Sequence, residues 1–263
     1  MTNESMHPES ALPSSALPPS EQAEQASAEQ ASAEPATAEP MSATPASPAS
    51  AGTDFASIDR EALRVFLGVG YDAVVAFAEM LDEVGETRGL IGPHERERLW
   101  ERHILNSAAV VPFLGAGRII DVGSGAGLPG IVVAAMLPDR EVVLVEPMER
   151  RVAWLDEASQ ALGLNNVTVV RARAEEVPWS IRADALTARA VASVDKLVKW
   201  CLPLLSETGH MALLKGRTAA DEVDRAKYVL RKARLTAEIL TAPTLEGMEP
   251  TTVVRISRES ANR

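Results

Sequence analysis

The sequence predicts an α/β protein with a seven-stranded, mostly parallel sheet and helices N-terminal to that sheet. Short apolar runs alternate with amphipathic helical stretches from residue 118 to residue 233, which is the pattern of a doubly wound sheet. A glycine-rich turn, Gly123–Gly130, directly follows the first run, and a strand, a glycine turn and a helix in this order open such a sheet. Two apolar runs without a helix between them close the pattern and predict a final β pair.

A sharp change of composition near residue 57 divides the chain. Residues 1–57 consist mainly of Ala, Ser, Pro and Glu, contain no Lys or Arg, and carry a degenerate five-residue repeat. Such a segment has too little apolar surface to offset its chain entropy, so we expect a disordered tail; it also lacks the features of a signal peptide. We expect three parts: this tail, a domain over 58–258 with a helical cap at 58–116, and a C-terminal tail at 259–263.

Charge and cysteine content restrict the class of protein. The net charge is −11, but eight of the 37 acids lie in residues 1–57, so the remainder has 29 acids against 26 bases, or −3. A domain this close to neutrality neither excludes a nucleic-acid partner nor provides a general basic field. The single cysteine, Cys201, fits a reducing compartment. No apolar run is long enough to span a membrane, so we expect a cytoplasmic protein.

Each expected element follows from hydrophobic spacing. Two helices broken by glycines are expected between residues 58 and 83, and a charged helical stretch between Pro93 and Asn106. On that stretch His103 and Asn106 lie three residues apart on one side. They are either structural contacts or residues that bind a ligand. The remaining helices are expected at 131–137, 149–162, 194–205 and 219–233, and the strands at 118–122, 141–145, 167–170, 183–188, 209–214, 235–240 and 252–256.

The glycine turn indicates a ligand-binding loop with more than one interpretation. Gly125, Gly127 and Gly130 match the dinucleotide pattern, and Glu146 ends the second strand, where an acid would accept the two hydroxyls of a ribose. Asp121 ends the first strand directly before the glycines. A carboxylate there would repel a pyrophosphate and attract an amino group, which favours S-adenosylmethionine over a dinucleotide. A purely structural turn, with Asp121 as a helix cap, stays open.

Four fragments carry a resemblance to a known family. Arg102–Ser107, Asp121–Gly130, Arg189–Ala190 and Leu214–Gly216 resemble the glucose-inhibited division protein B family, bacterial small-subunit ribosomal RNA guanine-N7 methyltransferases. The similarity covers roughly residues 58–258. It implies a class I, Rossmann-like methyltransferase fold, S-adenosylmethionine as the methyl donor, and a guanine in the decoding-region loop of 16S rRNA as the acceptor.

The resemblance also implies site residues. The family's cofactor positions fall on Gly123, Leu128, Ala174, Glu175 and Arg189. Two features depart from the family: the extension at residues 1–57 has no counterpart in it, and Asn106 stands where many members have Asp, which puts a charge-dependent role there in doubt.

The expected chemistry requires positioning more than proton transfer. Guanine N7 has a free lone pair at neutral pH, so no proton must leave before attack, and the protein can act by holding N7 in line with the methyl group. Two other acceptors are disfavoured. Cys201 lies in an apolar helical run and is an unsuitable nucleophile for carbon methylation, and the Asn/Asp-Pro-Pro-aromatic motif of amino methyltransferases is missing.

Candidate residues follow for each role. The catalytic candidates are Arg189, His103 and Lys215; Arg189 would bind guanine O6, a phosphate or the cofactor carboxylate, and the other two, with Arg217, are phosphate contacts or a solvated rim. No metal is expected. The expected cofactor-binding residues are Asp121, Gly123, Gly125, Leu128, Glu146, Ala174, Glu175 and Arg189.

The expected partner is 16S rRNA or the small ribosomal subunit, with no DNA and no membrane, and we expect a monomer. Two other classes stay open: a catalytically idle RNA- or ribosome-binding protein that keeps the pocket as structure, and an NAD-linked oxidoreductase that uses the glycine motif.

Overall fold

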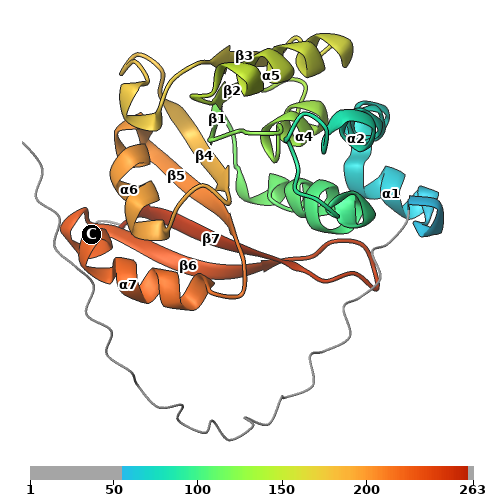
Figure 1. The fold of residues 1–263 in the computed structure, drawn as a ribbon. Helices are drawn as coiled ribbons and strands as arrows, with labels where there is room; N and C mark the ends of the chain where they lie inside the picture. The colour runs from blue at the N-terminus through green and yellow to red at the C-terminus, as the bar shows by residue number, and fades with distance from the viewer. Residues whose placement is uncertain (1–54, 260–263) are drawn as a thin grey trace, which may run out of the picture. The chain divides into compact units, whose positions relative to one another are not determined.

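The computed structural model describes residues 55–259 (Figure 1). The expected tail therefore lies outside the described residues except for its last three, and residues 260–263 lie outside them as well. Phe55–Ser57 forms a short 3-10 helix, η1, and the ring of Phe55 stacks on Trp100 with 4.4 Å between centroids. The packed part of the chain thus begins before residue 58. No helix in the described part is long and apolar enough to cross a membrane.

The predicted sheet of seven strands is confirmed. Its strand order is β3-β2-β1-β4-β5-β7-β6; the first five of these strands are parallel, and β7 runs antiparallel to both of its neighbours. The order reverses between β1 and β4, and in parallel sheets ligands bind at the carboxyl edge beside such a reversal. The strands are β1 (Ile119–Val122), β2 (Val142–Val145), β3 (Val167–Val170), β4 (Ala183–Arg189), β5 (Leu205–Lys215), β6 (Leu235–Ala242) and β7 (Thr251–Arg258).

Helices cover both faces of the sheet (Figure 1). All four residues of β1 are buried, and alternate side chains enter different cores: Ile119 packs with one layer of helices, and Ile120 and Val122 with the other. The two layers are the physical reason why the strands read as continuous apolar runs. On one face lie α1 (Arg60–Leu67), α2 (Tyr71–Val84), α4 (Gly130–Met136) and α5 (Glu149–Ala161), and on the other α6 (Val194–Cys201) and α7 (Ala219–Lys232).

The helical stretch expected between Pro93 and Asn106 is present from Arg96 onward, but it is not one continuous α-helix. The segment forms a 3-10 turn, η3 (Arg96–Arg98), then a π-helix, η4 (Leu99–Leu105), and then one α-turn, α3 (Asn106–Ala108). The buried side chains of η4 are Leu99 and Trp100, followed five residues later by Ile104 and Leu105. Residues five apart share a face in a π-helix, whose hydrogen bonds join i to i+5, but not in a 3.6-residue helix.

Candidate active site

The glycine loop connects β1 to α4 at the carboxyl edge of the sheet. Gly123 and Gly127 have φ values of 70° and 96°, which side chains other than glycine rarely adopt. The backbone amides of Gly123 and Ser124 both donate to the carbonyl of Val145, so the loop folds over the end of β2. At Gly130 the first turn of α4 passes so close to the sheet that an added Cβ would contact Leu144.

Two adjoining cavities lie against this loop, and we call them together the loop cleft. One, of about 420 Å³, is lined by the glycine loop, by Glu146–Met148 and by Arg189–Val191. The other, of about 210 Å³, is a more apolar slot that includes Val145, Trp200 and the predicted residues Ala174 and Glu175. The structure therefore brings the predicted residues Gly123, Gly125, Leu128, Glu146, Ala174, Glu175 and Arg189 to one cleft.

Glu146 lines the loop cleft with a carboxylate fixed at both oxygens. Its Oε2 accepts the amide of Gly125 and its Oε1 the amide of Met148, each at 2.9 Å. The residue is only 2% exposed. A carboxylate oxygen accepts more than one hydrogen bond, so both oxygens keep capacity for donors from a ligand.

The side chain of Asp121, a predicted cofactor-binding residue, does not line the loop cleft. It is fully buried and is absent from the lining of the loop cleft, because its side chain lies behind the loop. Its Oδ2 accepts the amide of Gly130 at 3.0 Å, while Oδ1 has no partner within residues 55–259. Burial raises the pKa of Asp121 to about 7. Asp121 thus fastens the start of α4, as in the structural interpretation.

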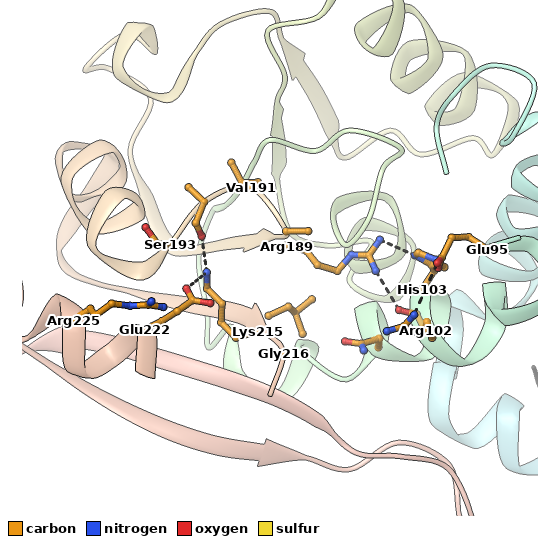
Figure 2. A pocket seen from close by; sticks show the side chains of 14 residues that line it. Glu95, Arg102, His103, Arg189, Val191, Ser193, Lys215, Gly216, Glu222 and Arg225 are labelled. Carbon is orange, nitrogen blue, oxygen red and sulfur yellow. Dashed lines mark hydrogen bonds and ion pairs between the residues drawn. The ribbon is translucent and has the colours of Figure 1, made fainter. Parts of the chain in front are cut away.

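A larger cavity of about 640 Å³, which we call the charged pocket, lies on the other side of Arg189–Val191 (Figure 2). It receives side chains from η4, from the end of β5 and from α7. The predicted catalytic residues Arg189, His103 and Lys215 all line it, as does Asn106, whereas Arg217 does not. Its other charged lining residues are Glu95, Arg102, Glu222 and Arg225.

Arg189, His103 and Glu95 form a chain of contacts along one side of the charged pocket (Figure 2). Arg189 donates through Nη2 to His103 Nδ1 at 3.0 Å and through Nη1 to the carbonyl of Arg102 at 3.1 Å. His103 Nε2 lies 2.6 Å from Glu95 Oε2. Because a guanidinium only donates, Nδ1 must accept, so His103 is neutral with its proton on Nε2.

The charges of this chain follow from its burial. Burial and the adjacent cation lower the pKa of His103, which agrees with the neutral ring. Burial lowers the pKa of Arg189 to about 10, although the carboxylates of Asp121 and Glu95 oppose that shift. Arg189 is therefore still cationic at neutral pH. Both ring nitrogens of His103 are occupied, so the ring orients Arg189 and has no free nitrogen for a ligand.

Lys215 is also held inside the protein. Its Nζ donates to the carbonyl of Ala192 at 2.6 Å and to Glu222 Oε2 at 2.9 Å, and its side chain is 7% exposed. The same Glu222 oxygen accepts the amide of Val194 at 3.2 Å. Burial alone would raise the pKa of Glu222, but the hydrogen bond and charge of Lys215 lower it. This pair joins α7 to the loop that follows β4.

The loop that follows β4 forms the wall between the loop cleft and the charged pocket. Ala190 and Val191 line both of them, and Ala190 has a φ of 56°, a strained conformation for a residue with a Cβ. Val191 packs directly on the glycine loop, because a Cβ added at Gly123 would lie 2.5 Å from its Cγ2. Strain of this kind persists only where the surroundings enforce it.

Sequence reasoning missed several of these residues. Glu95 reads as one charge of a solvated helix face, and Glu222 as a first-turn acid of α7. Val191 stands in a short loop without any pattern. The only indication of this part of the site in the sequence was that His103 and Arg189 lie in fragments that resemble the family. Within the described part of the chain no group of His, Cys, Asp and Glu could hold a metal ion.

Comparison with known proteins gives one consistent family. A family model described as rRNA small subunit methyltransferase G matches residues 71–245. A ribosomal RNA small subunit methyltransferase G from Beutenbergia cavernae is 49% identical over 207 residues, which cover 78% of this chain and 98% of that protein. A protein of the same name from Thermobifida fusca is 44% identical, covering 78% of this chain and 87% of its own.

The fold is shared more widely. A solved structure from Methanococcus maripaludis, assigned to the S-adenosyl-L-methionine-dependent methyltransferases, is similar with a TM-score of 0.51 at 16% identity, covering 71% of this chain and 94% of that one. At this identity the likeness shows the fold alone. The matches in sequence confirm the family to which the motifs pointed: the chain belongs to the rRNA small subunit methyltransferase G family.

Proposed function

We propose that this protein transfers a methyl group from S-adenosylmethionine to N7 of a guanine in the decoding-region loop of 16S rRNA. One observation carries the proposal: the loop cleft and the charged pocket meet at a single wall, Arg189–Val191. A donor bound on one side of this wall and a base bound on the other can meet at its edge. The family supports this reaction, and it supports neither an idle binding protein nor an oxidoreductase.

The residues of the loop cleft fit S-adenosylmethionine. Glu146 keeps acceptor capacity for the ribose hydroxyls, and the apolar slot beside Ala174 and Trp200 suits an adenine ring. Arg189 also lines this cleft and supplies a cation that suits the carboxylate of the methionine moiety. When bound, this cofactor supplies an electrophilic methyl group on a sulfonium. No phosphate-binding group is required, which fits the buried carboxylate of Asp121 behind the loop.

The charged pocket suits an acceptor that needs no base. Its histidine is neutral but has both nitrogens engaged, and Lys215 is paired with Glu222. Guanine N7 attacks with a lone pair that is already free. The contribution of the protein is then orientation, which can account for about 7–11 kcal/mol of barrier lowering. Arg189 is the charged residue among the three that line both cavities, and we assign it to guanine O6 or to the cofactor carboxylate.

His103, Glu95, Lys215 and Glu222 act in this proposal as positioning residues. His103 and Glu95 hold the guanidinium of Arg189 from one side, and the ion pair of Lys215 with Glu222 holds the loop after β4 from the other. Both supports converge on the strained wall at Ala190. The residues that the sequence assigned to catalysis thereby keep a part in the reaction, although two of them act through Arg189 and the wall.

The direct test is to map N7-methylguanine in 16S rRNA from cells with and without this protein, and in rRNA incubated with the purified chain and labelled donor. We expect one modified guanine in the decoding-region loop, and none with Glu146→Ala, which removes an acceptor of the loop cleft. Label on a different atom or a different RNA would overturn the assignment. We further propose that the protein is cytoplasmic, which fractionation of cells would test, and that it is a monomer, which light scattering of the purified chain would test.

A further inference from the structure

Helix α7 carries positive charge that the proposed reaction does not use. Residues 225–234 contain five cationic residues and no acid, in a domain whose net charge is close to neutral. All five are exposed, and within residues 55–259 only Lys227 has an ion pair, with Asp224 at 3.0 Å. The five cations are Arg225, Lys227, Arg231, Lys232 and Arg234.

Three of the residues on α7 form a continuous face, which we call the α7 stripe: Arg225, Tyr228 and Lys232. They are three and four positions apart, so they lie on one side of the helix, whereas Ala226 and Leu230 face the core. Tyr228 is 64% exposed, which is unusual for a large aromatic ring without a partner. From Arg225 to Lys232 the helix rises about 10 Å.

The α7 stripe begins at the charged pocket and leads away from it. Arg225 lines the pocket and extends from α7 towards Glu222 and Lys215 (Figure 2). The helix starts after β5, at the carboxyl edge of the sheet, and returns to the start of β6, so Tyr228 and Lys232 lie progressively further from the pocket.

The acids of α7 lie before the stripe. Glu222 is engaged with Lys215, and Asp224 with Lys227, on another side of the helix. Asp221 lies one turn before Arg225 and is the one acid on that face. Beyond Asp224 the next acid in the chain is Glu238, on β6. Within residues 55–259 neither Arg225 nor Lys232 forms an ion pair with these acids.

We propose that the α7 stripe binds the rRNA strand next to the target guanine, with Arg225 and Lys232 on phosphates and Tyr228 stacked on a flanking base. The inference rests on the proposed function. Proteins usually bind single-stranded nucleic acid with cations that lie along its phosphate backbone and with exposed aromatic rings on which its bases stack. Phosphate contacts fix the register of a strand without reading its sequence. A strand whose base enters the charged pocket must leave along one of its rims, and on the α7 rim Arg225 and Lys232 have no ion pair within the described residues.

The test is the affinity of the full chain for 16S rRNA across a series of salt concentrations, with matched variants. Lys232→Ala should lower the slope of log K against log salt by about 0.7–0.9, the value for one lost phosphate contact. Tyr228→Ala should weaken binding about tenfold, and Tyr228→Phe should restore it, because the ring provides the stack. Lys227→Ala is the control: the same residue type on the same helix, but paired with Asp224.

The readouts separate this inference from the proposed function. The losses should fall on the KM for rRNA, while calorimetric affinity for S-adenosylmethionine and the melting temperature stay the same. An unchanged salt slope in Lys232→Ala with full affinity in Tyr228→Ala would overturn the stripe, as would equal effects in Lys227→Ala. A loss seen only with assembled subunits and not with rRNA would point to a ribosomal protein and would also overturn it. If the stripe variants weaken rRNA binding but the wild-type protein forms no N7-methylguanine, the proposed reaction is wrong and the stripe is not.

Discussion

The loop cleft and the charged pocket lie on two sides of the same wall, but different parts of the chain build them. The cleft is formed chiefly by backbone: glycines of one loop, the amides that bind Glu146, and short segments after β1, β2 and β3. The charged pocket is formed by side chains from η4, β4, β5 and α7, joined by a hydrogen bond between Arg189 and His103, 86 residues apart, and by the ion pair of Lys215 with Glu222.

This difference determines what each cavity is sensitive to. Backbone conformation at a glycine changes only when an added side chain clashes, so the loop cleft should depend on steric changes and on the one buried carboxylate behind it. The charged pocket should depend on which guanidinium, imidazole and carboxylate are present and how they are held. The following changes test that division, from the largest expected effect to the smallest.

Gly130→Ala should have the largest effect, because the added Cβ would contact Leu144 and lie 2.6 Å from Asp121 Oδ2. We expect a loss of about 3 kcal/mol in the free energy of unfolding, the upper range for overpacking a core, together with loss of affinity for S-adenosylmethionine. Denaturant unfolding and calorimetry measure the two. Gly216→Ala is the control, since nothing lies within 4 Å of its added Cβ. Equal stability of the two variants would contradict the close packing of the loop.

Asp121→Asn should stabilise the protein in a pH-dependent way. Burial raises the pKa of Asp121 to about 7, above its unfolded value, so the wild type is most stable when this group is protonated and loses that stability as the pH rises towards 7. Asn cannot ionise. Between pH 5 and pH 8 the variant should therefore gain about 2–3 kcal/mol relative to wild type.

Denaturant unfolding of both proteins at the two pH values measures this gain. A constant difference between them would mean that Asp121 is ionised across the whole range. Loss of affinity for S-adenosylmethionine in Asp121→Asn, with stability unchanged, would instead restore the direct cofactor contact that the sequence suggested.

Arg189→Lys should lower single-turnover methyl transfer while leaving the fold intact. A lysine keeps the charge but cannot donate to His103, to the carbonyl of Arg102 and to a ligand in the same geometry. Loss of one charge-assisted hydrogen bond, about 1.5–3 kcal/mol, predicts a rate lower by about ten- to a hundredfold. The melting temperature should change little. A large drop in melting temperature at full activity would make Arg189 a structural residue only.

Glu95→Gln should have the smallest effect, about a three- to tenfold lower rate, the cost of one altered hydrogen bond. Glutamine can still accept from His103 but no longer carries the charge that opposes the low pKa of the ring. Because His103 is already neutral, the rate should be flat from about pH 7.5 to 9 in both proteins, above the pKa of Asp121 and below that of Arg189. A titration in this range that disappears in Glu95→Gln would make His103 a proton acceptor.

The sequence predicted the elements and the loop cleft because both are recorded in local patterns. Strands buried on both faces read as apolar runs, and the glycine loop with Glu146 spans few residues. The direction of the Asp121 side chain could not be predicted, because residue type shows a carboxylate at a strand end but the pleat decides where it points. Asp121 alternates with Ile120 and Val122, and the pleat turns its side chain towards α4, where it meets the amide of Gly130.

The charged pocket was predicted only in part. His103 and Arg189 are 86 residues apart, and nothing in either local sequence states that one donates to the other. Lys215 and Glu222 lie close in sequence but on a strand and on a helix, so their pairing depends on the turn between them. A helical stretch was predicted at Leu99–Leu105, but not its π type, in which the pairs Leu99–Ile104 and Trp100–Leu105 are five residues apart. These contacts come from tertiary packing.

The position of β7 in the sheet determines what a prematurely terminated chain would expose. β7 lies between β5 and β6 and, among the strands of residues 55–259, is the only neighbour of β6, yet it is made after both. A chain terminated between Ala242 and Thr251 would leave β6 without its partner β7 and expose the edge of β5, whose residues Met211–Leu214 are buried and apolar in the complete sheet. Long apolar edge strands recruit other chains. A nonsense mutation late in the gene should therefore produce an aggregating polypeptide and not a shortened, partly active enzyme.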